Sequence, residues 1–185
     1  MSTIKTTNIT HGSNTGTNNI ILDDTGKVSV AAKKLHCPGQ IIQVVQGKLT
    51  TTASFSGTDV WEDTGLSCTI TPQYTTSDIL VCYRVYLSAD GGNWRKTRLA
   101  RQIASGSFAA VTDAHAMSFS GSSQTTSQSH NIALDWMDDP SFSAGETVTY
   151  RVELDSQTST FYINRTGSGD NDFSSSTITL YEIAK

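Results

Sequence analysis

The sequence is poor in charged and aromatic residues and in proline. Only 16% of its 185 residues are Asp, Glu, Lys or Arg, and the formal net charge is −4 with no block of like charges. This composition argues against a nucleic acid or a membrane surface as the main partner. The first thirty residues hold no apolar run long enough for a signal segment, and no stretch anywhere is long enough to span a membrane. We therefore expect a protein that is made in a cytoplasm and stays there or leaves by lysis.

Cysteine is also scarce. The chain has three, Cys37, Cys68 and Cys82, with no Cys-x-x-Cys spacing. An odd count without that spacing indicates neither a disulfide framework nor a zinc site. Cys68 and Cys82 lie in strand-like runs, where a free thiol packs as a small apolar side chain. We expect all three cysteines to be reduced.

Metal-ligand patterns are equally sparse. The histidines are scattered, without a His-x-x-x-His pair: His11, His36, His115 and His130. Asp138-Asp139-Pro140 and Asp170-Asn171-Asp172 could offer oxygen ligands to calcium, but such clusters more often end strands as turns. We expect no metal and no cofactor, and calcium at the two acidic turns stays an open alternative.

The residues that are abundant favour strands. Ser (24) and Thr (27) make up more than a quarter of the chain, and apolar residues alternate with polar ones with a period of two, as in 147–154 and 177–183. Strands are expected near 40–46, 48–56, 58–61, 66–71, 78–88, 94–104, 107–119, 127–137, 146–155, 159–164 and 176–183. About ten short strands at regular spacing predict an all-β fold, an antiparallel β-sandwich of jelly-roll type.

The chain has two parts. Residues 1–39 form a Thr/Asn/Gly-rich arm with one predicted hairpin over 18–30, and residues 40–185 form the sandwich. The few apolar residues of the arm cannot build a core, and a lone hairpin is marginal in water. We therefore expect the extended arm to lie on sister chains or on a larger particle.

The tripeptide Asp-Thr-Gly, which aspartic proteases use, occurs twice, at 24–26 and 63–65. A protease needs both carboxylates in matched lobes, close enough to share a proton. Here one copy lies in the arm and the other in the domain, followed by Lys27 and Leu66 where the protease motif has Ser or Thr. Both copies are interpreted as turns.

A basic run at 93–101 places four Lys and Arg residues beside a tryptophan. It could bind an anionic glycan, with the indole under a sugar ring, or it could be a strand with one solvated basic face. Recognition by a sandwich is expected in loops, here 89–95, 120–128 and 166–175. The candidate contacts with a glycan or host are Trp94, Arg95, Tyr162, Asp170 and Asn171.

Several segments, in their order along the chain, resemble structural and fibre-like virion proteins of tailed bacteriophages, of the cyanophage and marine phage type. The match covers residues 18–185 and rests on these segments: 19–30, 40–45, 61–72, 78–81, 136–140, 147–152, 161–165 and 176–183. The resemblance implies a tail fibre, spike or surface adhesin, commonly homotrimeric, that is made in the host cytoplasm and resides in the virion. It implies sister subunits and other virion proteins as partners and carries over no catalytic residue.

Three other functions are weighed against the tail-fibre reading. A free-standing carbohydrate-binding lectin is suggested by Trp94 and Tyr162, and a head decoration protein by the short chain. A polysaccharide depolymerase needs two carboxylates flanking a sugar bond, for which the nearest candidates are Asp135, Asp138 and Asp139. No Gly-x-Ser-x-Gly elbow is present. We expect a protein that is not an enzyme.

Overall fold

The computed structural model describes residues 8–9, 20–22, 25, 28–30, 37–56, 59–89, 94–119, 128–156, 160–165 and 174–185. The chain divides into two compact units, Met1–Gln40 and Ile41–Lys185, and each is described by itself. Among the described residues of the first unit, short strands pair antiparallel in the order β1 (Asn8–Ile9), β2 (Ile20–Leu22) and β3 (Val28–Val30). The β2–β3 pair is the predicted hairpin, and β1 is an additional strand.

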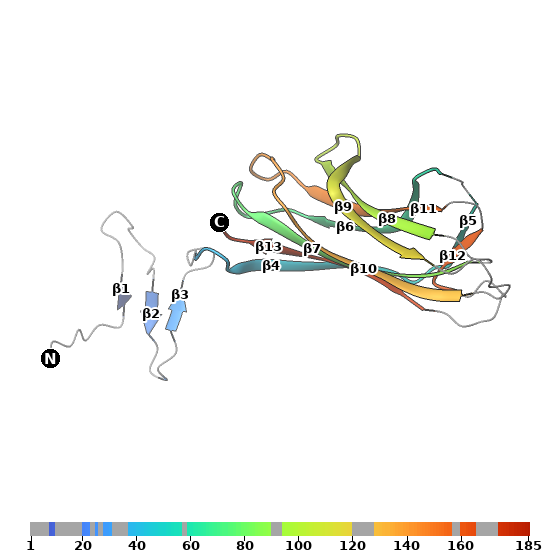
Figure 1. Ribbon diagram of the computed structural model, residues 1–185. Helices are drawn as coiled ribbons and strands as arrows, with labels where there is room; N and C mark the ends of the chain where they lie inside the picture. The colour runs from blue at the N-terminus through green and yellow to red at the C-terminus, as the bar shows by residue number, and fades with distance from the viewer. Residues whose placement is uncertain are drawn as a thin grey trace. The chain divides into compact units, whose positions relative to one another are not determined.

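The described residues of the second unit form two antiparallel sheets of long strands (Figure 1). The long strands are β4 (Ile41–Leu49), β6 (Glu62–Ile70), β7 (Asp78–Ala89), β8 (Trp94–Ile103), β9 (Ala109–Phe119), β10 (Gln128–Asp138), β11 (Val148–Ser156) and β13 (Ser176–Ile183). One sheet has the order β4-β13-β7-β10 and the other β6-β11-β8-β9. Two short strands, β5 (Ala53–Phe55) and β12 (Phe161–Ile163), extend the first sheet, where β12 pairs with the end of β7.

The strand order identifies the sandwich type. Counted along the chain, the first, eighth, third and sixth long strands form one sheet, and the second, seventh, fourth and fifth form the other. This arrangement of nested Greek keys in two sheets is the jelly roll. The prediction of an all-β, antiparallel sandwich of jelly-roll type is confirmed.

Apolar side chains from both sheets fill the space between the layers. On β13, for example, Ile178 and Leu180 are fully buried, while Thr177 and Thr179, which alternate with them, are half-buried. The largest buried apolar side chains in the core are Leu66, Ile70, Ile79, Leu87, Leu99, Tyr150, Leu154, Phe161, Ile163, Ile178 and Leu180. All of them belong to Ile41–Lys185, so this core lies within the second unit, and burying each side chain contributes roughly 1.5–3 kcal/mol.

One predicted turn is instead part of a strand. Asp63-Thr64-Gly65 lies inside β6, where the pairing with β11 shifts register between Arg151 and Glu153. Gly65 has φ of 79°, and its amide donates to Oδ1 of Asp63 at 2.8 Å. These features make the segment a β-bulge, because extra residues on β6 face fewer on β11. The turn prediction for 63–65 was therefore wrong, although its Asp–Gly backbone chemistry is present. Asp24 and Gly26 of the other copy lie outside the described residues.

A buried asparagine joins the ends of β4, β12 and β13. Asn164 has φ of 58° and is fully buried. Its Nδ2 donates to the carbonyls of Leu49 and Thr51 at 2.9 and 3.0 Å, and its Oδ1 accepts from the Ser176 hydroxyl at 2.7 Å. Both polar atoms of its side chain have hydrogen-bond partners, and these bonds offset the cost of removing the amide from water.

Candidate functional site

Strand alternation divides the basic run of the sequence between two environments. On β8, Arg95, Thr97 and Leu99 are buried, whereas Lys96 and Arg98 are only partly buried and lie on the outer face of the four-stranded sheet. Successive strand side chains point to opposite faces, so the guanidinium groups of Arg95 and Arg98 are turned away from each other. The outer face therefore receives only part of the predicted basic cluster.

Trp61, immediately before β6, contacts basic side chains of two strands on this outer face. The Cζ atom of Arg98 lies 4.3 Å from the centroid of the Trp61 ring. The ring of His115 on β9 stacks with Trp61 at 5.8 Å between centroids and 20° between planes. Arg98 and His115 are directly opposite each other in the β8–β9 ladder, which is why one indole contacts both.

Next to this aromatic contact lies a network of ion pairs. Glu153 on β11 accepts from Nε of Arg98 at 2.7 Å and from Nη2 of Arg151 at 2.5 Å. Arg151 also contacts Asp63 at 3.2 Å and places its Cζ 4.0 Å from the centroid of the Phe108 ring. Burial alone would raise the pKa of Glu153, but the two arginines outweigh burial, and the pKa lies below its ordinary value of 4.5. The network fixes the side chains beside Trp61.

A hollow of about 400 Å³ opens beside Trp61 on the outer face. It is lined by Trp61, Lys96, His115, Ala116 and Met117, and we call these five residues the Trp61 shelf. Met117 is 66% exposed, and Val60 next to Trp61 in the chain is 55% exposed. The shelf thus combines an aromatic ring and a thioether with the amino and imidazole groups of two basic side chains, and none of these lining residues is a carboxylate.

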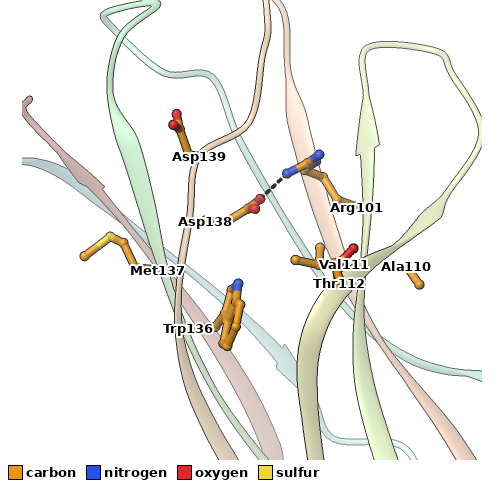
Figure 2. A pocket seen from close by; sticks show the side chains of 8 residues that line it. All are labelled: Arg101, Ala110, Val111, Thr112, Trp136, Met137, Asp138 and Asp139. Carbon is orange, nitrogen blue, oxygen red and sulfur yellow. Dashed lines mark hydrogen bonds and ion pairs between the residues drawn. The ribbon is translucent and has the colours of Figure 1, made fainter.

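A second hollow, of about 320 Å³, lies where β9 and β10 approach each other (Figure 2). In Figure 2, Arg101 and Asp138 face each other beside Trp136, while Met137 is on the other side of its strand. Asp138 accepts from Nη1 of Arg101 at 2.5 Å and from the hydroxyl of the buried Tyr150 at 2.6 Å. The Asp138 carboxylate is therefore held in a structural ion pair.

The acidic residues proposed for a depolymerase do not form a catalytic pair. Asp138 is bound to Arg101, and Asp139 forms a 2.6 Å salt bridge with Lys185. Asp135 is an odd number of strand positions from Asp138, so it lies on the outer face, where it is hydrogen-bonded to Cys82. Two carboxylates flanking one sugar bond are therefore not assembled here.

The predicted contact residues lie in different environments, and some of them fall outside the described residues. Arg95 is only 1% exposed, which does not fit its predicted contact with an external ligand, because alternation on β8 turns residue 95 inward. Tyr162 is half-buried, with the Cζ atom of Arg165 4.3 Å from its ring centroid. The Trp94 side chain and both Asp170 and Asn171 lie outside the described residues. Contacts by Trp94, Tyr162, Asp170 and Asn171 stay a prediction.

Two general features of the described residues bear on function. They contain no group of three or more His, Cys, Asp or Glu side chains arranged to hold a metal ion. In the same part of the chain, no helix is long and apolar enough to cross a membrane. Of the cysteines, Cys37 is exposed, Cys68 buried and Cys82 half-buried, and all three are free.

Comparison with family models and with curated proteins gives no match. Among solved structures, the chain is similar to the Eiger TNF from S. frugiperda, with 10% identity and a TM-score of 0.41 over 77% of this chain and 94% of that one. It is also similar to a chain of infectious bursal disease virus, Gx strain, with 10% identity and a TM-score of 0.36 over 78% of this chain and 37% of that one. The fold assignment rests on the strand order itself.

Proposed function

We propose that this chain is a non-enzymatic structural protein of a bacteriophage virion, a tail fibre, spike or surface adhesin that assembles as a homotrimer. In this proposal the arm, residues 1–39, attaches it to other virion proteins and the sandwich projects outward. The resemblance of residues 18–185 to phage fibre-like proteins supports a place in a phage virion. The jelly roll is the compact domain that would face outward. The protein is synthesised in the host cytoplasm and resides in the virion.

The observation that carries self-assembly is a row of apolar side chains on the outer face of the β4-β13-β7-β10 sheet. Val44 pairs with Tyr181, Tyr181 with Leu80, and Leu80 with Met137, so the four side chains share one face across four strands. Val44 is 53% exposed and Met137 is 51% exposed. We call this set the apolar row. Tyr181 and Leu80 in its middle are half-buried, and an apolar row that crosses four strands and is exposed at both ends favours an interaction surface.

The surroundings of the apolar row favour a second copy of this chain as its partner. Ile41, which is 53% exposed, pairs with Ile183 on β13. This pair lies beside the Val44–Tyr181 pair and lengthens the apolar row. On the other side, exposed Asp135 and Arg84 give one face charges of both signs. A face that carries apolar residues together with acidic and basic groups can pack its apolar end against another part of the same face on the next copy, the head-to-tail contact that closes three subunits around an axis.

The test is light scattering, which measures the mass of the particle that the intact chain forms in solution. The parent protein is compared with Met137→Asp and with a matched control, Met117→Asp on the opposite sheet. We expect the parent protein and Met117→Asp to give three times the chain mass of 19.9 kDa. Met137→Asp should dissociate, because a carboxylate buried in an apolar contact is strongly unfavourable. A monomeric parent protein, or a Met137→Asp variant that stays assembled, contradicts the proposal.

The arm is tested separately. Deleting residues 1–39 should leave a folded sandwich, since the core lies within Ile41–Lys185, but the truncated chain should fail to join the particle. Circular dichroism reports the fold, and a density map of the whole particle locates the subunit on tail or head. An unfolded truncation would show that the boundary after residue 39 is wrong.

A further inference from the structure

We infer that the Trp61 shelf is a binding site for an acidic saccharide, a sugar that offers an apolar ring face and a carboxylate. The inference rests on the proposed role of the sandwich as the outward part of a particle. If copies meet through the apolar row, the outer face of the other sheet, which carries the shelf, is left to solvent. The predicted aromatic–basic site is thereby assigned to Trp61 rather than to Trp94.

The shelf is held in place before any ligand arrives. Trp61 contacts both Arg98 and His115, and Arg98 is fixed in turn by its 2.7 Å ion pair with Glu153. A ring immobilised by its neighbours loses little conformational entropy when a ligand stacks on it. Rigid aromatic side chains with an apolar body and a polar tip suit the mixed surface of a sugar.

The polar groups around the hollow are chiefly donors. Lys96 stands opposite Asp155 in the β8–β11 ladder, and an ammonium group has three donors, so a contact with Asp155 does not exhaust it. The nearby acids Glu153 and Asp63 are engaged by Arg98 and Arg151. A ligand carboxylate can therefore approach Lys96 and His115 without meeting a carboxylate in the lining.

The size and composition of the hollow fit one sugar residue, with the adjoining sugars of a longer saccharide lying outside the hollow. About 400 Å³ lies in the lower part of the range typical of small-molecule sites. Met117, 66% exposed, offers a flexible apolar contact at the rim. The site is open rather than enclosed on the sheet face, so a longer saccharide can pass across it.

The test is a titration of the intact chain, followed by tryptophan fluorescence and amide NMR shifts. The probes are an oligosaccharide of galacturonic acid and its carboxyl-reduced, neutral counterpart. We expect the acidic probe to bind and the neutral probe to bind more weakly. Trp61→Ala should lower affinity for the acidic probe about tenfold. Lys96→Gln should lower the affinity for the acidic probe to that for the neutral probe.

Matched variants keep the result interpretable. Met117→Ala should weaken binding, whereas Met137→Ala, an exposed methionine of the other sheet, should not. If Trp61→Ala does not fold, Trp61→Phe and Lys96→Gln decide the question. Equal affinity for both probes, no binding of either, or loss of binding in Trp94→Ala but not in the Trp61 variants overturns the inference.

Two further measurements separate this inference from the proposed assembly. Light scattering on the same samples reports whether the apolar row joins copies, and Met137→Asp should lose assembly while still binding the acidic probe. Failure of binding with assembly intact overturns only the saccharide site. An acidic peptide that binds at the shelf when neither saccharide does also overturns it, in favour of a protein partner.

Discussion

The Tyr150 hydroxyl donates a 2.6 Å hydrogen bond to the carboxylate of Asp138 and joins the two sheets of the sandwich. Tyr150 lies on β11 of one sheet and Asp138 on β10 of the other, and Arg101 on β8 donates to the same carboxylate oxygen. Burial, followed by the Asp138 charge, raises the pKa of Tyr150. The hydroxyl therefore stays protonated and remains a hydrogen-bond donor. The contact ties the two sheets together beside the hollow between β9 and β10.

Replacing Tyr150 by Phe should lower the free energy of unfolding by about 1.5–3 kcal/mol, the usual worth of a buried hydrogen bond to a charged group. Urea unfolding followed by circular dichroism measures the loss. Tyr86→Phe, on the outer face of β7, is the control and should change stability little. An unchanged urea midpoint for Tyr150→Phe would contradict a structural role for the bond.

The strands and fold class were predictable because they depend on local patterns. The predicted ranges 78–88 and 176–183 match β7 and β13 within a residue, since alternation of buried and exposed positions is read directly from the sequence. The bulge at 63–65 was missed because an Asp and Gly pair favours turns and bulges alike. Local chemistry alone does not say which of the two the neighbouring strand selects.

The candidate site was less predictable because it depends on long-range register. Trp94 and Arg95 are adjacent in the sequence, but alternation sends residue 95 into the core. Trp61 reaches Arg98 and His115 only because β6, β8 and β9 share one sheet. The apolar pair Val60-Trp61 directly before a strand was a signal, yet nothing in the sequence showed which basic side chains Trp61 would contact.

Stability should depend on pH through Glu153. Its pKa in the folded protein lies below the ordinary 4.5, so it stabilises the fold above pH 4.5, and that contribution disappears as pH falls through the folded pKa. At pH 7, Glu153→Gln should therefore be less stable than the parent by about 1–3 kcal/mol. Urea unfolding at pH 7, 5, 4 and 3 should show the two proteins converging at the acidic end. A constant difference across this range would rule out the linkage.

The three thiols should differ in reactivity. Burial, then the hydrogen bond and charge of Asp135, raise the pKa of Cys82 to about 11, so at pH 8 only about one Cys82 in a thousand is a thiolate. Exposed Cys37 should be alkylated first, Cys82 slowly, and buried Cys68 only on unfolding. In a Cys37→Ser background, Asp135→Asn should accelerate alkylation of Cys82 by iodoacetamide, measured by mass spectrometry. An unaltered rate would mean that Asp135 does not control this thiol.

The close approach of β4 to β6 depends on Gly47. A Cβ built at this position would overlap the carbonyl oxygen of Ser67 and lie 3.1 Å from Cγ2 of Ile178 and 3.2 Å from Cβ of Cys68. The overlapping atom belongs to the backbone, so relief requires β4 and β6 to separate. Gly47→Ala should lower the free energy of unfolding by about 1–3 kcal/mol or more. Lys48→Ala, on the neighbouring exposed position, is the matched control and should unfold like the parent. If Gly47→Ala has the same urea midpoint as Lys48→Ala, the two strands are not in the tight contact that closes this side of the sandwich.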